Sequence, residues 1–396
     1  MKIVMVSFVS DNRWTGMGKW TYQISESLAA GGHSVERWFS EDFPSLVRFG
    51  RLARHMYPFV LAWNLIYRRK EFDAVVIHEP GGLPYGFLRR FWRSLPPCVC
   101  MCHNVESHVF RTMLAWAHLG LSKVSKKQQF TFYIWNRLHA DGAIRFADKV
   151  VCLSTRDWVY VTTRWRRPCD VFRKVNGAAR EDISAGPRVE LGERVLFVGG
   201  WLDIKGRQVL PKIWEMLLAR RPKATLSIVG SGQPAELVLA DFLPAQRASI
   251  RVIPRVKSPA EMTGLYFNHD IFLMPSLGEG SPLALIEAMA TGMAVVISDV
   301  GGVPDIVRAG VDGLLFPSGD AAAACEALTQ ILEDRELGIR LAHAAERRAR
   351  ELTWEESAAC VEAALFAATG KHGAGIDYSG QPRRWPCDRV PNIEPR

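Results

Sequence analysis

The stretch IFLMPSLGEGSPLALIEAMATGMAVVISD (residues 271–299) places a helix-length segment between two short apolar runs, IFLMPS and AVVISD. Short continuous apolar runs that alternate with helical segments are typical of parallel strands buried on both faces of a sheet. The same alternation recurs along most of the chain. Strands are expected at residues 2–9, 34–39, 73–78, 98–102 and 149–154, and then at 194–200, 224–230, 249–256, 271–276, 294–299 and 313–317. We therefore predict an α/β protein with doubly wound, Rossmann-like sheets.

The alternation pauses over residues 176–194, which are rich in Gly, Ala and charge. The chain has 396 residues, more than the ~250–300 residues at which single cores stop growing, so two domains are expected. Their facing strand ends would form a ligand cleft. The predicted parts are an N-terminal Rossmann-like domain (1–180), a linker (181–193), a C-terminal Rossmann-like domain (194–352), a helix returning to the first domain (353–370) and a flexible tail (371–396).

The composition, with 48% hydrophobic and 23% charged residues, is that of a globular protein. Eight cysteines without regular spacing, in a chain without a recognisable secretion signal, favour a reducing compartment. The longest uncharged apolar run, MYPFVLAWNLIY (56–67), is shorter than the ~20 residues of a membrane span. We therefore expect a cytoplasmic protein without a transmembrane helix.

Positive charge is concentrated in the first half of the chain. Residues 1–190 hold 28 Lys and Arg against 16 Asp and Glu, whereas residues 191–396 hold 22 against 25. Segments 43–70 and 87–94 mix arginines with aromatic and aliphatic residues, as in helices that lie on anionic membranes. The alternative is a helix packed on the sheet with a solvated basic face. No nucleic-acid-binding module is recognised, so nucleic acid is not an expected partner.

The loop SLGEGSP (276–282) has the features of an anion site. Pro282 suits the first turn of a helix and Ser281 suits an N-cap, so a helix should begin near residue 282. A helix start offers free N–H groups and about half a positive charge, and this one follows a strand, at the ligand-binding edge of the sheet. Glu279 and Glu287 flank it and could accept hydrogen bonds from sugar hydroxyls. Lys205, after another strand, could balance a diphosphate, or could be an ordinary surface lysine.

Four stretches resemble a known family: FVGGWLDIKG (197–206), IVGSGQPAEL (228–237), LMPSLGEGSPLALIEAMATGMAVVISDVGGVPDIV (273–307) and DGLLF (312–316). They resemble the C-terminal half of retaining, nucleotide-sugar-dependent glycosyltransferases of the GT-B fold, of the group-1 or family 4 type. The resemblance implies transfer of a sugar from a UDP- or GDP-linked donor to an acceptor hydroxyl. It also implies that residues 194–352 form the nucleotide-sugar-binding domain and residues 1–180 the acceptor-side domain. No metal motif is recognised, and no metal or other cofactor is expected.

The resemblance also implies roles for single residues. Glu287 would bind the ribose, Glu279 would face the donor sugar, and Lys205 would contact the diphosphate. The chain has Gly200 where the family usually has an arginine, so either another cation substitutes, with Arg207 and Arg255 as candidates, or donor binding is weakened. The implied donor-binding set is Gly16, Gly18, Gly199, Lys205, Arg255, Glu279, Gly280, Ser281, Pro282, Leu283, Ala284 and Glu287.

In the first half, Gly16 and Gly18 precede a helix expected near Lys19, and the resemblance implies that this loop lies close to the diphosphate and acceptor. His103 follows a strand, and the resemblance places it near the donor sugar, although a lone histidine is more often structural. With Lys205 and Glu279 it completes the implied catalytic set. Cys98, Cys100 and Cys102 alternate beside His103 but are read as buried apolar residues rather than metal ligands.

The main hypothesis is a retaining glycosyltransferase in polysaccharide or lipid-linked glycan synthesis, with a glycan or lipid-linked acceptor. Peripheral contact with the inner membrane face would involve residues 43–70 and 87–94. The alternatives are a sugar-nucleotide epimerase or phosphorylase on the same fold, and a non-catalytic membrane-associated scaffold.

Overall fold

A computed structural model describes residues 1–133, 137–178, 190–256 and 258–371. Its contacts divide the chain into two compact units. The first unit contains residues 1–108, 129–174 and the chain from 355 on, and the second contains residues 109–128 and 175–354. The chain therefore passes between the units several times rather than once.

The first unit is built on a six-stranded sheet with the order β2-β1-β3-β4-β5-β6, and every pairing is parallel. Four of the strands are buried along almost their whole length, which explains their continuous apolar sequences. The strands are β1 (Lys2–Val6), β2 (Ser34–Trp38), β3 (Ala74–His78), β4 (Cys98–Cys102), β5 (Lys149–Cys152) and β6 (Val171–Arg173).

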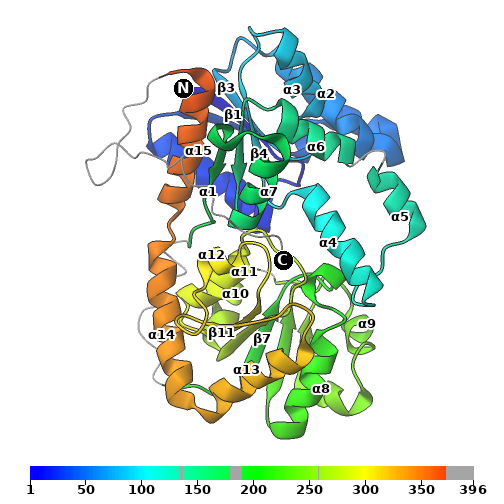
Figure 1. The fold of residues 1–396 in the computed structure, drawn as a ribbon, viewed down its shortest axis with the longest axis vertical. Helices are drawn as coiled ribbons and strands as arrows, with labels where there is room; N and C mark the ends of the chain where they lie inside the picture. The colour runs from blue at the N-terminus through cyan, green and yellow to red at the C-terminus, as the bar shows by residue number, and fades with distance from the viewer. Residues whose placement is uncertain (134–136, 179–189, 257, 372–396) are drawn as a thin grey trace. The chain divides into compact units, whose positions relative to one another are not determined.

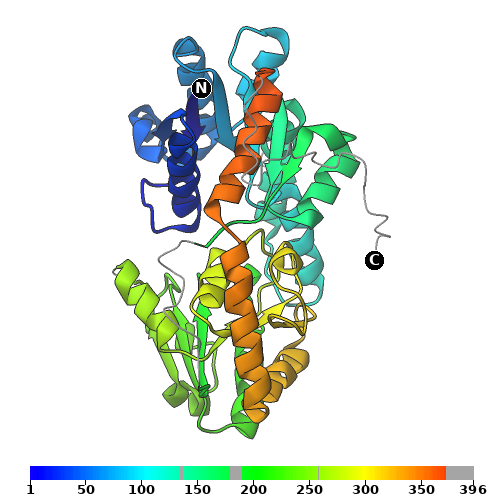
Figure 2. The ribbon, with the colours of Figure 1, turned by 90° about the vertical axis from the view of Figure 1, so that its left-hand side faces the viewer.

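Helices cover this sheet on both faces. Helices α2, α3 and α6 pack side by side as one layer (Figure 1). Helix α15 lies against the first unit near the turn between α1 and β2, where Glu362 binds His33 at 2.7 Å (Figure 2). The helical elements from β1 to β6, together with the last helix, are α1 (Gly16–Ala30), η1 (Ser40–Asp42), η2 (Pro44–Leu52), α2 (Ala53–Tyr67), α3 (Leu83–Phe91), α4 (Glu106–His118), α5 (Lys126–Thr131), α6 (Arg137–Phe146), α7 (Thr155–Trp165), η4 (Pro168–Asp170) and α15 (Trp354–Thr369). Most of α4 groups with the second unit.

The second unit repeats this architecture with a parallel sheet in the order β12-β11-β10-β7-β8-β9. Successive residues of β7 point to opposite faces, so that Val195 and Phe197 join one buried cluster and Leu196 joins another. The strands are β7 (Arg194–Val198), β8 (Thr225–Val229), β9 (Ile250–Ile253), β10 (Ile271–Met274), β11 (Ala294–Ser298) and β12 (Leu314–Phe316).

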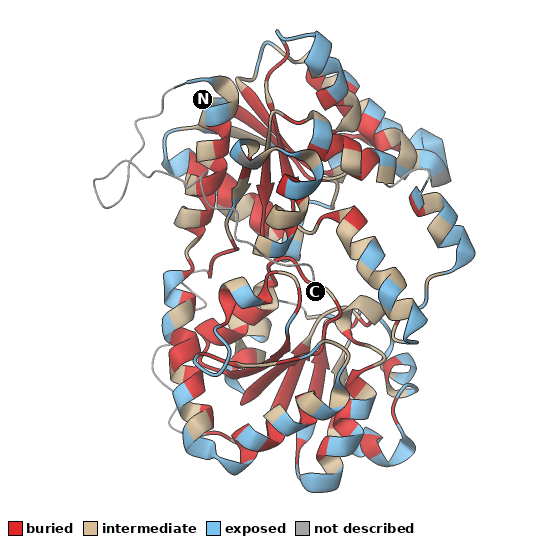
Figure 3. Cartoon of the chain, in the orientation of Figure 1, coloured by how far each residue is buried: buried red, intermediate tan, exposed pale blue. Residues whose placement is uncertain are grey.

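The helices of the second unit seal both faces, and the strands form a buried layer between them (Figure 3). They are η6 (Asp203–Lys205), α8 (Leu210–Arg220), α9 (Ala235–Leu239), η7 (Pro244–Ser249), α10 (Pro259–Phe267), α11 (Leu283–Ala290), α12 (Val303–Ile306), α13 (Ala321–Glu333) and α14 (Arg335–Glu351). The predicted fold class, with two Rossmann-like sheets, is thus confirmed.

Some local expectations differ from the structure. Strand β6 was not expected, because its short sequence VFR is buried only at Val171. Helix α1 begins at Gly16, not near Lys19, because Thr15 caps it by accepting a hydrogen bond from Gly18 N. Residues 109–128 group with the second unit, whereas the sequence places them in the first domain. Most of the expected linker and tail, at 179–189 and 372–396, lies outside the described residues.

Within the part of the chain that the structure describes, no helix is both long enough and apolar enough to cross a bilayer. The apolar run at 56–67 forms most of α2, and its buried residues face the core of the first unit.

Candidate functional site

The start of α11 carries most of the residues expected to bind the donor. Pro282 occupies the N-cap position, and Ile286 N makes the first intrahelical bond, to Pro282 O at 3.4 Å. The amides of Leu283, Ala284 and Leu285 precede this bond. Leu283 and Ala284 are only half-buried. The helix start is therefore not sealed in the core, and its leading amides lie at the carboxyl edge of the sheet, where they can bind an anion.

Ser281 is not the N-cap that the sequence indicates. It precedes Pro282, which takes the cap position without a side-chain bond. Instead, Ser281 Oγ accepts a hydrogen bond from Asn176 N at 2.8 Å, and Asn176 Nδ2 donates to Ser281 O at 2.7 Å. Ser281 thus anchors the loop to residues 175–178, and its expected cap role is wrong.

Glu279 and Lys205 meet directly, although 74 residues separate them in the sequence. Lys205 Nζ lies 2.7 Å from Glu279 Oε1 and 2.9 Å from Oε2, and Ser276 Oγ donates to Oε1 at 2.7 Å. The carboxylate is 5% exposed, whereas the lysine side chain is 32% exposed. Glu279 is therefore held in a fixed orientation by two donors, while part of the lysine remains open to solvent.

Two glycines make this approach of loops possible. A Cβ on Gly206, which has φ +86°, would lie 2.2 Å from Pro275 O. A Cβ on Gly301, which has φ +50°, would lie 1.5 Å from Glu279 O. Any other residue at either position would push the loops apart, because such distances are far inside van der Waals contact. The glycines thus fix where Lys205 and Glu279 meet.

Glu287 lies one helical turn into α11 and is half-buried. Its Oε2 accepts a hydrogen bond from Tyr266 Oη at 2.9 Å, across from the end of α10. A carboxylate held in this way can accept further hydrogen bonds from hydroxyl groups. The expected contact of Glu287 with ribose stays a prediction.

The two candidates for a second cation differ in their surroundings. Arg207 binds Asp241 through two hydrogen bonds, of 2.7 and 3.2 Å, and this carboxylate raises the pKa of the guanidinium. Arg255 is exposed in the loop after β9. A Cβ on Gly200 would meet only Leu202, at 3.5 Å, so the space for a side chain exists there. Arg207 is thus engaged elsewhere, and the position next to Gly199 lacks a cation.

Residues 109–128 border the same site from within the second unit. Trp116 Nε1 donates to Leu277 O at 3.2 Å, and Lys123 N donates to Asp203 Oδ2 at 2.9 Å. Trp116 and Leu121 also pack against the hydrophobic cluster of this unit. This packing explains why the segment belongs to the second unit, and it supports the loops that carry Glu279 and Lys205.

In the first unit, His103 follows β4 and packs edge-on against two rings, with centroids 5.0 Å from Trp20 and 4.6 Å from His78. Ser7 Oγ lies 3.1 Å from His78 Nδ1. Burial lowers the pKa of His103 to about 4, and it lowers the pKa of His78 well below its usual range. Both imidazoles are therefore neutral near pH 7, which suits the positioning of a hydroxyl better than protonation of a leaving group.

Glu79 follows β3 and adds an acid to this histidine pair. Its Oε1 accepts a hydrogen bond from Glu106 N at 3.1 Å. Burial raises the pKa of Glu79 well above its usual range, and burial also raises the pKa of Glu106. Among the described residues, Glu79 Oε2, His78 Nε2 and His103 Nε2 are buried without a hydrogen-bond partner. These atoms mark the carboxyl edge of the first sheet as a polar site that a ligand could complete.

The structure explains why a glycine is required at position 18 but not why one occurs at position 16. A Cβ on Gly18 would lie 1.9 Å from Asn12 O, so a side chain cannot fit there. A Cβ on Gly16 would meet nothing within 4 Å. Both residues lie in the first turn of α1, and their contact with a donor stays a prediction.

The cysteines of β4 are buried and free. Cys98 belongs to one apolar cluster, and Cys100 and Cys102 belong to another. In the described part of the chain, no group of three or more His, Cys, Asp or Glu side chains is arranged to hold a metal ion.

Several residues of these sites were missed by the sequence analysis. His78 and Glu79 follow a predicted strand just as His103 does, so their position at a strand end could have indicated them. Asn176, Ser276 and Tyr266 carry no local signal, because they act only through partners distant in the sequence.

Comparison with known proteins agrees with this geometry. Residues 192–334 match the family described as Glycosyl transferases group 1. The D-inositol 3-phosphate glycosyltransferase of Corynebacterium efficiens is 31% identical over 198 residues, which cover 48% of this chain and 47% of that protein. The corresponding protein of Nocardia farcinica is 32% identical over 206 residues, covering 50% of this chain and 45% of that protein. The chain thus spans about half the length of the curated relatives it matches.

Solved structures resemble the whole fold. Sucrose-phosphate synthase from Thermosynechococcus elongatus has a TM-score of 0.70 at 20% identity, covering 93% of this chain and all (100%) of that one. Anabaena HepE in complex with UDP-glucose has a TM-score of 0.65 at 17% identity, covering 92% of this chain and 99% of that one.

The fold is therefore that of the GT-B glycosyltransferases. Within it, residues 192–334, which carry Lys205, Glu279 and Glu287, match the group-1 glycosyltransferase family, as the resemblance in the sequence indicates.

Proposed function

We propose that the protein is a retaining glycosyltransferase that moves a sugar from a UDP- or GDP-linked donor to an acceptor hydroxyl. The observation that carries this proposal is the pair of Lys205 and Glu279 beside the open start of α11. The amides at the start of α11 and the ammonium group of Lys205 present positive charge to a diphosphate. Glu279 and Glu287 present hydrogen-bond acceptors on either side of that charge.

In the proposed reaction, cleavage of the glycosyl–phosphate bond leaves negative charge on the diphosphate. Donors that are fixed before the reaction stabilise such charge most effectively, because they need not reorganise when it develops. Ser276 and Lys205 already orient Glu279, and Gly206 and Gly301 fix both loops. We propose that the acceptor hydroxyl attacks from the face that the diphosphate leaves, and that a phosphate oxygen takes its proton.

We further propose that the acceptor is a glycan or a lipid-linked glycan, so that the product belongs to polysaccharide or lipid-linked glycan synthesis. The neutral His78 and His103 and the buried Glu79 support a hydroxyl-bearing acceptor at the first unit. The excess of Lys and Arg in residues 1–190 supports action at the inner face of a membrane, from the cytoplasm.

Calorimetric titration with UDP and GDP tests donor binding. We expect one nucleotide to bind, and Glu287→Ala to weaken it by about 10- to 100-fold, because a hydrogen bond to a charged group is worth roughly 1.5–3 kcal/mol. Tyr266→Phe is the matched control, since it removes only the hydroxyl that orients Glu287 and should weaken binding only a few-fold. Equal affinity of Glu287→Ala and the wild type would refute the assignment.

NMR of the product with the acceptor present tests the reaction itself, and retention at the anomeric carbon is the expected result. Conversion of the donor without an acceptor would instead indicate an epimerase, and dependence on inorganic phosphate would indicate a phosphorylase. The scaffold alternative is favoured by one observation, the missing cation beside Gly199, with Arg207 bound to Asp241. Failure of both nucleotides to bind would support it.

A further inference from the structure

The outer faces of α2 and α3 expose a large apolar surface. Phe59, Trp63 and Tyr67 are 46%, 73% and 81% exposed. Because they are spaced four residues apart, they form one stripe along α2. Phe91 on α3 is 76% exposed. Large exposed aromatic surfaces usually mark an interaction site.

The opposite face of α2 is well packed, so the exposed aromatic side chains do not reflect poor packing of the helix. On α2, Tyr57, Leu61 and Leu65 are also spaced four residues apart, and each is at most 3% exposed. The helix therefore has one apolar face for the core and a second apolar face that is largely exposed at Trp63 and Tyr67, while Phe59 also packs edge-on against His139. Helices α2 and α3 pack together, and Arg69 lies 5.0 Å from the ring of Trp92, which joins their C-terminal ends.

Cations surround this surface. Four exposed Lys and Arg residues lie on η2, α3 and the turns that follow α2 and α3. They are Arg48, Lys70, Arg90 and Arg93. The nearby acids are already paired, Glu71 with Arg68 at 2.6 Å and Asp148 with Arg89 at 3.5 Å. The surface therefore combines aromatic side chains with a positive rim, as membrane-interface helices do.

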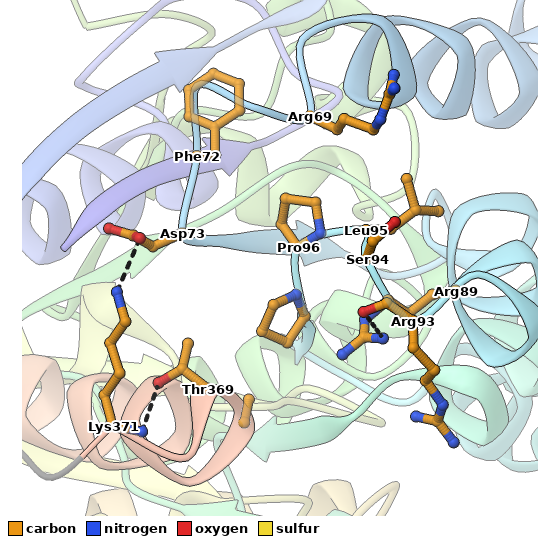
Figure 4. Close-up of a pocket in the computed structure, with 12 residues that line it drawn as sticks. Arg69, Phe72, Asp73, Arg89, Arg93, Ser94, Leu95, Pro96, Thr369 and Lys371 are labelled. Atoms are coloured by element: carbon orange, nitrogen blue, oxygen red, sulfur yellow. Dashed lines mark hydrogen bonds and ion pairs between the residues drawn. The ribbon is translucent and has the colours of Figure 1, made fainter.

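A polar hollow of about 350 Å³ lies at one end of the surface, where α2, α3 and α15 end beside the start of β3 (Figure 4). Arg69, Arg89, Arg93 and Lys371 line it, and Asp73 binds Lys371 at 2.8 Å. Arg93 is 63% exposed and lies 3.9 Å from its nearest carboxylate, that of Asp148. Its guanidinium can therefore turn toward an anion in the hollow, which the other cations already make positive.

We propose that the outer face of α2 and α3 docks on an anionic lipid bilayer, with the aromatic side chains in the interface and a lipid phosphate in the hollow lined by Arg69, Arg89 and Arg93. The membrane contact itself does not depend on the proposed function. Only its role, the delivery of a lipid-linked acceptor, rests on that function. A second copy of the chain fits less well, because two such faces would bring their cations opposite one another. An anionic bilayer complements the positive rim.

Flotation of the full chain with vesicles tests the proposal. We expect binding to vesicles of phosphatidylcholine and phosphatidylglycerol in equal parts, weaker binding at high salt, and little binding to phosphatidylcholine alone. The triple variant Trp63→Ser, Tyr67→Ser and Phe91→Ser should bind about 100-fold more weakly, since partial burial of each side chain contributes roughly 1 kcal/mol. These side chains are exposed, so the variant should fold normally.

A matched control removes three exposed apolar side chains of the second unit, through Leu237→Ser, Leu243→Ser and Val311→Ser. It should bind vesicles like the wild type. Arg69→Gln with Arg93→Gln should weaken binding to the anionic vesicles by roughly 5-fold per cation. Arg340→Gln with Arg347→Gln, exposed on α14, is the control for that pair and should have no effect.

Three results would overturn the proposal. The wild type could fail to bind the anionic vesicles, or the aromatic variant could bind as well as the wild type. Sedimentation could also show a dimer that the aromatic variant dissociates, which would assign the face to a second copy. Titration with UDP and GDP in the same variants separates this outcome from failure of the proposed function. Loss of vesicle binding with donor binding intact concerns the surface alone.

Discussion

The carboxyl edges of the two sheets differ in how their ionisable side chains are accommodated. In the second unit, charged groups are paired, since Lys205 binds both oxygens of Glu279 and Ser276 adds a further donor. In the first unit, burial lowers the pKa of His78 and His103 and raises that of Glu79, and each leaves one polar atom without a hydrogen-bond partner among the described residues. One edge is prepared for a charged ligand and the other for neutral groups.

This difference shows how the same fold can carry two chemically different polar sites, one with paired charges and one with buried polar atoms. Fixed charges stabilise a diphosphate, and because they neutralise each other beforehand they do not destabilise the empty site. Buried polar atoms without partners cost about 1–3 kcal/mol each, so they are seldom retained unless a ligand or water completes them. The unpaired atoms of the first unit, which cluster at one strand edge, are thus candidate contacts for a ligand.

The largest expected effect on sugar transfer tests the charged edge. Lys205→Ala leaves a nearly buried carboxylate without its cation, so we expect a loss of roughly 2–3 kcal/mol in the free energy of unfolding and a greater relative loss in sugar transfer. Glu279→Gln in the same chain should restore most of the stability but not the transfer. Denaturant unfolding and single-turnover assays measure the two quantities. Full activity per folded molecule of Lys205→Ala would contradict the proposed role.

The next prediction concerns the loss of stability at two pairs of glycines, one pair in each unit. Gly301→Ala would place a Cβ 1.5 Å from Glu279 O, whereas Gly310→Ala, also at positive φ, meets nothing within 4 Å. We expect Gly301→Ala to destabilise the protein by more than about 3 kcal/mol, and Gly310→Ala by about 1 kcal/mol. In the first unit, Gly18→Ala should likewise be far worse than Gly16→Ala. Thermal melts of the four variants test this order, and equal melting temperatures within either pair would argue against it.

The neutral edge predicts a dependence on pH. Burial lowers the pKa of His103 from an ordinary 6.5 to about 4, so between these values the unfolded chain binds more protons than the folded one. The contribution of His103 to stability is therefore fully present above pH 6.5 and is lost as the pH falls toward 4. His103→Gln should therefore lose less stability than the wild type when the pH falls from 7 to 5, and His78 titrates in both proteins. Denaturant unfolding at the two pH values measures this loss. An equal loss in the wild type and the variant would count against a neutral buried His103.

The smallest expected effect is a gain. Gly200→Arg restores a cation where a Cβ has ordinary contact distance to Leu202, at 3.5 Å. A partly exposed charge contributes up to about 1 kcal/mol, so donor affinity should rise by about 5-fold. Titration with the preferred nucleoside diphosphate measures the change. Gln233→Arg, at an exposed position after β8 of the same sheet, tests whether any added cation has the same effect, and an equal gain there would remove the special role of position 200.

Much of the fold could be predicted because its signal is local. Eleven strands were expected from short apolar runs, and each has a counterpart, from β1 at Lys2–Val6 to β12 at Leu314–Phe316. Strand β6 was missed because only one of its three residues is buried, so it lacks a pattern. The start of α1 was predicted too late, because glycine disfavours helix and the first turn after the cap, Thr15, contains two glycines.

The sequence by itself determined which elements form and where the reactive residue types lie along them, since periodicity and turn chemistry act over a few residues. Only the tertiary structure decided which groups meet. Lys205 and Glu279 are 74 residues apart, and Asn176 and Ser281 are 105 residues apart. It also decided that residues 109–128 support the second unit, through the bond from Trp116 to Leu277. Such pairings, like the burial that keeps His103 neutral, depend on the packing of distant segments, for which a local pattern carries no signal.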